Sequence, residues 1–560
     1  MMYIRLLILS IILYIKEIYS EKDNLLYKCS FDDEMQKPSL LETRIPLDYN
    51  NSLYRRRLKD IDEDGFKKFN IFVDCTNLKE EIKKNNLSQY ENIIIESLQK
   101  TARTLESLLK VQPLSEDIWI SDNLLISHNI NYWDKEKFGN EAYNKKNTFI
   151  SLGIDLVIFP RLDNFTNKTT LASAICFRHT LNKRPLLGIL NINSRIEYNK
   201  KNIQEYLHTL FLHEFTHILG FSNFYFEDVF HNFFRRKDNY GIERFYLNSS
   251  KVIEVAKKYY NCTDIDGIEL ENYGGSDTVG SHWEARILLG EYMCGYKYLE
   301  EETISELTLA YLEDTGFYKA NYYTGGLMRF GKNKGCKFIK DKCIIDFEVN
   351  PEFENEFYNS IYYSYVDPGC SSGRLSRTYK FLSRYSNIPK EFQYFNNSNY
   401  GGFSAGDYCP IPQVFSKDQE TNFYSSSCTK YGDGNYGDQI DYPEFWIEGN
   451  IIHFSKSYNN SQLEKMTGEK YSDHSFCFLS SLIKKTEEKS EIFSKKFRAI
   501  CFETFCSSSS LTVKIHENYI VCPRSGGKIE VDKYGGYLLC PDYNLICTGT
   551  IMCNNINDCI

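Results

Sequence analysis

The sequence has no basic excess, no second long apolar run and no internal repeat. Its 560 residues include 66 basic and 75 acidic side chains, and the formal net charge is -9. We therefore expect no nucleic-acid partner, since such proteins normally show a basic excess or stripe. Hydrophobic residues make up 42% and charged residues 25%, which excludes a mainly disordered chain and a protein with many membrane spans. At ~150 residues per domain, the length predicts three or four compact units.

The one pronounced apolar run, from Leu6 to Ile15, lies at the start of the chain. It is about half the ~20 residues that a helix needs to cross a bilayer. Arg5 before it and Ser20 after it are typical of a secretory signal peptide, which we predict over residues 1–20; an uncleaved anchor helix is the alternative. We expect no transmembrane span in the mature chain. The polar C-terminus lacks the apolar tail of a glycolipid-anchor signal.

Eighteen cysteines in an otherwise ordinary composition indicate an oxidising compartment. Together with the signal peptide they predict a secreted, extracellular protein, with association at a cell surface as an alternative. Asn-x-Ser/Thr sequons are glycan acceptors where they are exposed in a secreted chain. Eight occur, at Asn50, Asn86, Asn164, Asn167, Asn248, Asn261, Asn396 and Asn459.

Predicted strands and helices alternate up to about residue 220. Beyond about residue 345 the chain is rich in Tyr, Ser, Gly and Cys, and we expect an irregular, disulfide-rich domain there. The expected strands are 70–74, 155–159 (closed by Pro160) and 186–192. The expected helices are 88–110, 202–220, 250–260 and 303–315, the last opening with a capping box from Thr303 to Glu306.

Residues 213–217 (HEFTH) form the motif that points to a catalytic metal site. His213 and His217 are spaced i and i+4, so that they lie on one face of a helix and can bind one metal ion. Glu214 lies between them in sequence and can take a proton from the attacking water. Zinc lowers the pKa of water and polarises a carbonyl, so the motif predicts a zinc peptidase. A chance match in a packing helix is the alternative, which the strongly helical context and the stop signal at Gly220 disfavour.

A catalytic zinc site normally has three protein ligands and one open position. The compact form of this site would place the third ligand at Asn223, which is a poor ligand, so the third ligand must come from further along the chain. Among the ten histidines, His282 stands out because it lies in the segment GSHWE, and Met293 follows eleven residues later. The other downstream histidines are His231, His453, His474 and His516. His208 faces away from the motif on the same helix, and we interpret it as structural.

Further blocks occur in a recognisable order between about residues 70 and 430. They are ASAICFRHTLNKRPLLGILNIN (172–193), HEFTHILGF (213–221), GSHWE (280–284), SELTLAYLEDTGFYKANY (305–322), GKNKGC (331–336), FQYF (392–395) and DYCP (407–410). In these blocks and their order the chain resembles the leishmanolysin family of metzincin-type zinc endopeptidases. In that family a long insertion separates the third histidine from the zinc helix.

The resemblance implies an α+β fold with a metzincin-like catalytic domain, built from a mixed sheet and an active-site helix, and one Zn²⁺ per chain. It implies His213, His217 and His282 as zinc ligands, Glu214 as general base and Met293 as the residue of the Met-turn. Protein or peptide substrates in extended conformation would add as a β-strand beside the zinc helix, along the strand at 186–192. The insertion between the second and third histidines should fold, since a structureless loop of that length would be unusual.

The resemblance also implies a propeptide with a cysteine that silences the zymogen by binding the metal. Cys29 is the candidate, although the family's flanking histidines are absent and an ordinary disulfide is the alternative. We expect the propeptide over 21–57, ending near the basic triplet at 55–57, which could also be a solvated charge run. Beyond it we predict an N-terminal catalytic subdomain (58–225), a central subdomain (226–345) and a Cys-rich C-terminal domain (346–560).

The sequence thus predicts a secreted, monomeric zinc endopeptidase. The alternative is a non-catalytic cell-surface adhesion protein that keeps the metalloprotease fold. Glu214 favours the enzyme, because a binding module needs no general base. A zinc hydrolase acting on something other than peptides is a third hypothesis, and it depends only on shared metal chemistry.

Overall fold

A computed structural model describes most of the chain between residues 61 and 547. The longer stretches outside the description are 1–60, 135–147, 358–368, 415–426, 429–443, 454–464, 486–497 and 548–560. The predicted signal peptide and propeptide, with Cys29 and the basic triplet, lie outside the described residues. So do the sequons at Asn50, Asn167 and Asn459. The other five sequon asparagines, Asn86, Asn164, Asn248, Asn261 and Asn396, are exposed.

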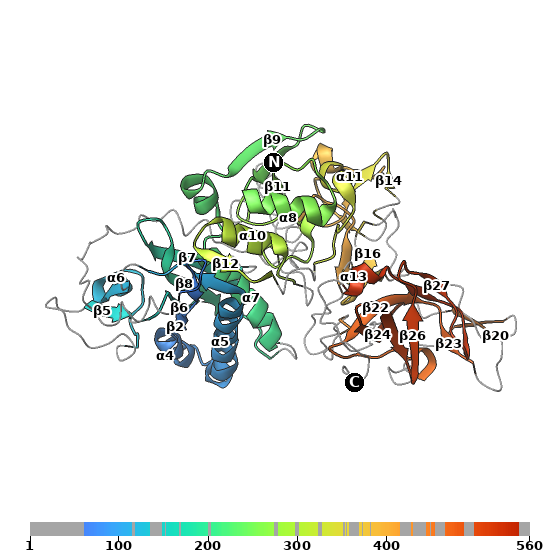
Figure 1. The fold of residues 1–560 in the computed structure, drawn as a ribbon, viewed down its shortest axis with the longest axis horizontal. Helices are drawn as coiled ribbons and strands as arrows, with labels where there is room; N and C mark the ends of the chain where they lie inside the picture. The colour runs from blue at the N-terminus through green and yellow to red at the C-terminus, as the bar shows by residue number, and fades with distance from the viewer. Residues whose placement is uncertain are drawn as a thin grey trace, which may run out of the picture.

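A four-stranded mixed sheet forms the centre of the N-terminal part (Figure 1). Its strands lie in the order β2 (Ile71–Val73), β6 (Leu156–Asp163), β8 (Pro185–Asn193) and β7 (Ala172–His179). The first three are parallel, and β7 runs antiparallel along β8. Every residue of β8 is buried, as expected for a strand with both faces covered. The predicted strands 70–74 and 186–192 are thereby confirmed.

Strand β6 does not end at Pro160, contrary to the prediction that this residue closes it. Strand β2 ends opposite Ile158, whose carbonyl accepts a hydrogen bond from Asp74 N at 2.9 Å. Two residues later Pro160 faces the same side, where β2 no longer runs, so its missing N–H interrupts no ladder. The next residue on that side, Leu162, donates its N–H to the Glu81 side chain at 2.6 Å.

Two helices cover the sheet and contact each other, α5 (Glu91–Leu108) and α7 (Ile203–Ile218). Helix α5 ends two residues before the predicted position, because Leu109 is extended and begins strand β3 (Leu109–Val111). Strand β3 pairs with β1 (Lys67–Lys68) and β12 (Tyr318–Ala320). The remaining N-terminal elements are α4 (Thr76–Lys84), β4 (Ile118–Ser121), α6 (Asp122–Ser127) and β5 (Thr148–Ser151).

The long segment between the second and third histidines of the predicted site is folded, as expected. It contains a turn of π-helix at Phe224–Val229 and a sheet in the order β11 (Ile268–Leu270), β10 (Glu243–Leu247) and β9 (Phe233–Lys237). Helix α8 spans Ser250–Tyr260, as predicted, and contacts α10 (Glu306–Asp314). The short helices α9 (Ala285–Leu288) and α11 (Gly335–Lys340) follow the third histidine.

Helix α10 begins at Glu306, three residues later than predicted, so that the proposed capping box is wrong. Ser305 is the N-cap, and its Oγ accepts the N–H of Thr308 at 3.2 Å. Thr303 instead pairs through its backbone, since it donates its N–H to Gly290 O at 2.9 Å. A serine at the cap position explains the shift, because its short side chain satisfies an N–H group of the first turn.

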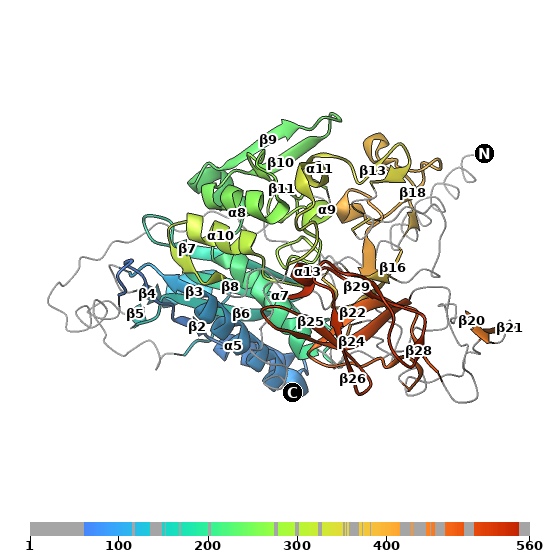
Figure 2. The same ribbon diagram turned by 45° about the vertical axis from the view of Figure 1, so that its right-hand side comes forward.

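The C-terminal part is more regular than predicted. It contains a six-stranded antiparallel sheet (Figure 2), in the order β26 (Asn518–Cys522), β25 (Leu511–Ile515), β24 (Arg498–Cys506), β22 (Ser475–Ser480), β29 (Leu538–Cys540) and β27 (Gly527–Ile529). Central strands such as β24 are mostly buried on both faces, so they lack the alternation that marks a half-exposed strand. Helix α13 (Tyr543–Cys547) packs against β25.

The other described strands beyond residue 343 are short and lie outside this sheet. They are β13 (Ile344–Ile345), β14 (Glu348–Val349), β15 (Gly369–Cys370), β16 (Arg377–Lys380), β17 (Ser383–Arg384), β18 (Tyr400–Gly401), β19 (Pro412–Val414), β20 (Glu444–Ile447), β21 (Asn450–His453), β23 (Ile483–Lys484) and β28 (Tyr534–Gly535).

Six disulfides join described residues between Cys262 and Cys547, which confirms the disulfide-rich character. They are Cys262–Cys336, Cys343–Cys409, Cys370–Cys477, Cys428–Cys501, Cys506–Cys547 and Cys522–Cys540. Cys75, Cys176 and Cys294 are the free thiols of the described residues. Across the same residues, no helix combines the length and apolarity needed to cross a membrane.

Candidate metal centre

Helix α7 brings the HEFTH motif into the interior of the molecule. His213, Glu214 and His217 are all buried, and the helix contacts strands β7 and β8. The contact with β8 is close because Gly188 faces Ile218, where an added Cβ would lie 2.6 Å from the Ile218 Cγ2 atom. The helix ends at Ile218, and Gly220 turns the chain with a φ of +116°.

Each of the three predicted metal-binding histidines donates its Nδ1–H to a backbone carbonyl. His213 donates to Tyr292 O at 2.6 Å, His217 to Phe221 O at 2.6 Å and His282 to Thr278 O at 2.9 Å. A carbonyl can only accept, so these contacts fix the proton of each neutral ring on Nδ1. Nε2 is then the unprotonated nitrogen on all three rings.

The three Nε2 atoms point at one another. His217 Nε2 lies 3.1 Å from His213 Nε2 and 3.2 Å from His282 Nε2. With each proton on Nδ1, no hydrogen bond can join these atoms, and three lone pairs would only repel. Ligands at about 2.0–2.1 Å from a tetrahedral zinc ion lie about 3.3–3.4 Å apart. The donor atoms therefore fit a metal site.

Burial favours the neutral form of His217 and His282. Desolvation lowers the pKa of His282 to about 4, and it also lowers the pKa of His217 far below the ordinary value, helped by the neighbouring His213 and His282. A neutral imidazole is the form that binds a metal. The site is thus electrostatically prepared for a cation.

Met293 lies in a buried turn that contacts the histidine cluster. Trp283, next to His282, donates its N–H to Met293 O at 3.1 Å. The turn approaches the cluster closely at Gly295, where an added Cβ would lie 3.4 Å from the Cγ of His282. The structure therefore brings together Glu214, the three histidines and the backbone around Met293, while their individual roles stay predictions.

The other histidines considered from the sequence lie elsewhere. His208 contacts Thr101 of α5, its Nδ1 3.0 Å from the Thr101 hydroxyl, in keeping with a structural role. His231 and His474 are exposed, and the Nε2 of His516 lies 3.1 Å from Lys465 O. The His453 side chain lies outside the described residues.

The predicted substrate strand requires a correction. Strand β8, which contains residues 186–192, lies between β6 and β7, so both of its edges are already paired. A further strand cannot add to it, because its backbone groups are used in the sheet. Strand β7 is the edge strand on this side, and it contacts α7.

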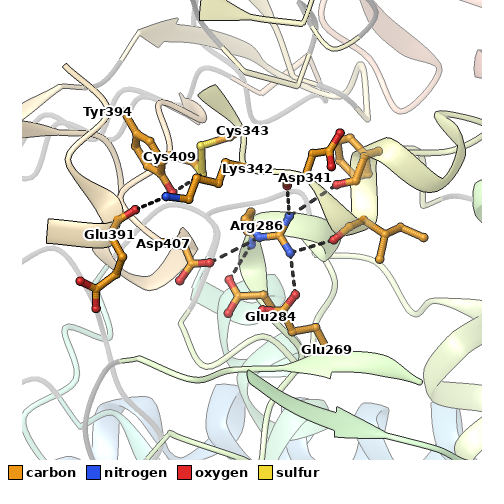
Figure 3. Close-up of a disulfide and its surroundings, with 12 residues drawn as sticks. Glu269, Glu284, Arg286, Asp341, Lys342, Cys343, Glu391, Tyr394, Asp407 and Cys409 are labelled. Carbon is orange, nitrogen blue, oxygen red and sulfur yellow. Dashed lines mark hydrogen bonds and ion pairs between the residues drawn. A yellow bond between two sulfur atoms is a disulfide. The ribbon is translucent and has the colours of Figure 1, made fainter. Parts of the chain in front are cut away.

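Two of the resemblance blocks meet in a buried ionic cluster (Figure 3). Glu284 of GSHWE and Asp407 of DYCP come together with Glu269, each offering an oxygen within 4.8 Å of the others. Arg286 lies between them, 2.5 Å from Glu269 and 3.4 Å from Asp407, and Arg244 contacts the same two carboxylates. The guanidinium groups account for this gathering of acidic residues, which fixes the chain directly after His282.

The carbonyl partners of the histidines could not be found from the sequence, since a backbone acceptor carries no residue signature. Glu291, Ser305 and Thr308 form a further buried group beside Met293. Their only signal in the sequence is their position near Met293 and within the block at 305–322.

Comparison with known proteins gives consistent matches. The sequence model of the family described as leishmanolysin matches residues 140–555. Leishmanolysin of Leishmania major is 26% identical over 389 residues, which cover 66% of this chain and 55% of that protein. The leishmanolysin homolog of Crithidia fasciculata is 32% identical over 244 residues, 41% of this chain and 34% of that protein.

A leishmanolysin-like peptidase of Drosophila melanogaster is 32% identical over 179 residues, which cover 30% of this chain and 26% of that protein. The chain thus spans roughly a quarter to just over half of the length of these relatives.

Proposed function

This chain belongs to the leishmanolysin family of metallopeptidases, and on that premise we propose that it is a secreted zinc endopeptidase that hydrolyses peptide bonds of proteins. One observation carries the proposal: three buried histidine Nε2 atoms converge, each with its Nδ1 proton held by a backbone carbonyl. His213, His217 and His282 would hold one Zn²⁺. The bound ion would supply a Lewis acid that polarises the scissile carbonyl and acidifies water.

Glu214 would act as the general base. It follows His213 on α7 and is buried, so its carboxylate operates away from bulk solvent. It would accept a proton from the attacking water and then deliver that proton to the leaving amine nitrogen. Met293 would form the floor of the site, on the turn whose carbonyl is bonded to Trp283.

Substrate would bind in extended conformation along the edge strand β7 (Ala172–His179). An edge strand offers unpaired N–H and C=O groups to a further strand, and β-strand addition draws its affinity from main-chain hydrogen bonds. Such binding is tolerant of side-chain identity, so we expect broad specificity. Extended protein segments are the substrate class that this geometry favours, rather than the small molecules of another zinc hydrolase.

Several finer assignments remain part of this proposal. They are zymogen silencing by Cys29, N-glycosylation at exposed sequons, action as a monomer, and the domain limits at 57, 225 and 345. The non-catalytic adhesion protein remains the alternative, and the general base Glu214 is the feature that speaks against it.

Casein cleavage by the zinc-loaded protein from residue 58, with and without a chelator, tests the proposal. Glu214→Gln should abolish cleavage while the protein still binds one zinc, because the base is lost and the ligands remain. Glu205→Gln is the matched control, since Glu205 lies on the same helix in an exposed ion pair with Lys100. A folded, zinc-loaded wild type that cleaves nothing, even when full-length protein is treated with a thiol reagent, would favour the adhesion alternative.

A further inference from the structure

Glu291 is a fully buried carboxylate in the turn that contacts the histidine cluster. We propose that Glu291 is a positioning residue: it fixes this turn against the start of α10, so that the Tyr292 carbonyl holds the Nδ1 proton of His213 and the turn sits correctly beside His282. The inference deepens the proposed function, on which it rests, and it assigns a role to a residue outside the zinc-binding motif.

Both oxygens of Glu291 are used. One accepts the Thr308 hydroxyl at 2.6 Å, the Ser305 hydroxyl at 2.9 Å and the Ser305 N–H at 3.3 Å. The other accepts the N–H of Met293 at 2.5 Å. The carboxylate therefore joins two separate segments, the turn and the first turn of α10, and it does so with acceptors only.

The turn is connected directly to the first histidine. Tyr292 accepts the Nδ1–H of His213 through its carbonyl at 2.6 Å, and its phenol oxygen lies 3.0 Å from the Thr216 hydroxyl on α7. Its N–H donates to Thr303 O at 3.0 Å. The position of Tyr292 therefore determines the orientation of the His213 ring.

The same network reaches the third histidine. Thr308 donates to Glu291 and also accepts the indole N–H of Trp283 at 2.8 Å. Trp283 follows His282 and donates its backbone N–H to Met293 O. Movement of the turn would therefore shift the chain that carries His282 as well as the acceptor of His213.

A merely structural role would not need a carboxylate at this place. A buried carboxylate is costly unless it is fully hydrogen-bonded, and burial raises the pKa of Glu291 to about 7. An apolar residue could fill the same volume at a lower cost in desolvation free energy. A carboxylate at the start of α10 is instead useful because it accepts from several donors at once, in the favourable field of a helix N-terminus.

Glu291→Gln gives a sharp test, since it changes one acceptor oxygen into a donor. The side that faces Ser305 and Thr308 must stay an acceptor, so the new NH₂ group would face the N–H of Met293. Two donors would then oppose each other, and the turn should move away from the histidines. We expect the zinc affinity of the folded protein, measured by competition with a chromophoric chelator, to fall about 10–100-fold. Glu306→Gln, on the same turn of α10, is the matched control.

Two milder substitutions, Thr308→Val and Thr308→Ser, provide a second test of the same network. Valine keeps the volume and loses both hydrogen bonds, whereas serine keeps the hydroxyl. Zinc affinity should fall in the valine variant and be restored in the serine variant. If the valine and glutamine variants are folded, with lowered melting temperatures but wild-type zinc affinity, Glu291 is only structural and the proposal is overturned.

A measurement without metal separates this inference from the proposed function. In metal-free protein with ¹⁵N-labelled histidine, NMR reports which ring nitrogen carries the proton. The wild type should show His213 protonated on Nδ1, and Glu291→Gln should lose that signature while Glu306→Gln keeps it. A wild type that binds no zinc would remove the proposed function. An unchanged His213 tautomer in Glu291→Gln would remove the positioning role even if the wild type proves to be a zinc peptidase.

Discussion

Three histidine rings in this protein each donate a hydrogen bond to a backbone carbonyl. The acceptors belong to Tyr292, Phe221 and Thr278, and they come from three different segments of the chain. His213, His217 and His282 could be singled out from the sequence because two of them share a helix face and the third stands in a distinctive block. Their acceptors could not, since any residue type can supply a carbonyl.

Acid should destabilise the metal-free protein through His282. Burial lowers its pKa to about 4, below the ~6.5 of an exposed histidine, so the folded state binds the proton less readily than the unfolded chain. The contribution is fully present above about pH 6.5 and is lost as the pH falls through 4, by up to roughly 3 kcal/mol. Urea unfolding of metal-free protein between pH 4 and 7 measures it. His282→Asn should weaken the dependence, to which buried His217 also contributes, whereas the exposed His474→Asn should leave it unchanged; equal slopes in all three proteins would contradict this.

Even one added methyl group at Gly188 should destabilise the fold. A methyl group there would lie 2.6 Å and 2.8 Å from atoms of Ile218, one residue beyond His217. Gly188→Ala should therefore push α7 from the sheet, cost about 1–3 kcal/mol of unfolding free energy, and weaken metal binding. Denaturant unfolding and zinc titration measure the two effects.

The matched control for this variant is Gly406→Ala, where an added Cβ meets nothing closer than 3.5 Å. Ile218→Ala in the Gly188→Ala background should relieve the clash, so that the two substitutions are less harmful together than their sum. Strict additivity would show that the contact between β8 and α7 does not limit the site.

At the scale of elements, the positions of most strands and helices could be predicted from the sequence. Their ends and the pairing of the strands could not. Pro160 is typical of a strand end because proline has no N–H to donate to a neighbouring strand, and only the early end of β2 shows that no such hydrogen bond is needed here. Strand β8 looked like a substrate-binding strand, but its edges are occupied by β6 and β7. Pairing partners are long-range facts that local periodicity does not contain.

Helix α13 should depend on one buried arginine. Arg329 donates to the carbonyls of Leu545 and Ile546 near the end of that helix, the latter at 2.6 Å. Arg329→Met should remove these charge-assisted bonds, lower the unfolding free energy by about 2–4 kcal/mol, and allow the C-terminal sheet to unfold separately. Calorimetry should then show two transitions. Arg524→Met, an exposed arginine over the Tyr543 ring, is the control, and a single unshifted transition in Arg329→Met would disprove the prediction.

At the scale of the whole molecule, the cysteine content predicted a disulfide-rich C-terminal domain but not the regular sheet within it. The strands there carry cysteines and small polar residues on buried faces, and their order depends on pairings between distant segments. Cys370–Cys477 illustrates this, because it joins β15 to β22 over a sequence separation of 107. Connectivity of this kind cannot be read from spacing alone.

Removing this disulfide should weaken the molecule without touching the histidine cluster. In the chain-entropy account, a loop of this length stabilises the folded state by about 5 kcal/mol. Cys370→Ser with Cys477→Ser should lower the unfolding free energy by an amount of that order in denaturant titration. Casein cleavage by the folded fraction should persist. Loss of cleavage in a variant that is still folded would mean that the C-terminal sheet contributes to the site.

The distance along the chain between the second and third histidines also has a consequence for the order of events during synthesis. His282 follows His217 by 65 residues, and at ~5–20 residues per second a ribosome needs about 3–13 s to add them. During that interval the emerging polypeptide carries two of the three histidines. A metal held by all three histidines, as proposed, would be selected by tetrahedral geometry only after His282 has been added. The ion would then be selected where the finished chain folds, and not while the helix with His213 and His217 is being made.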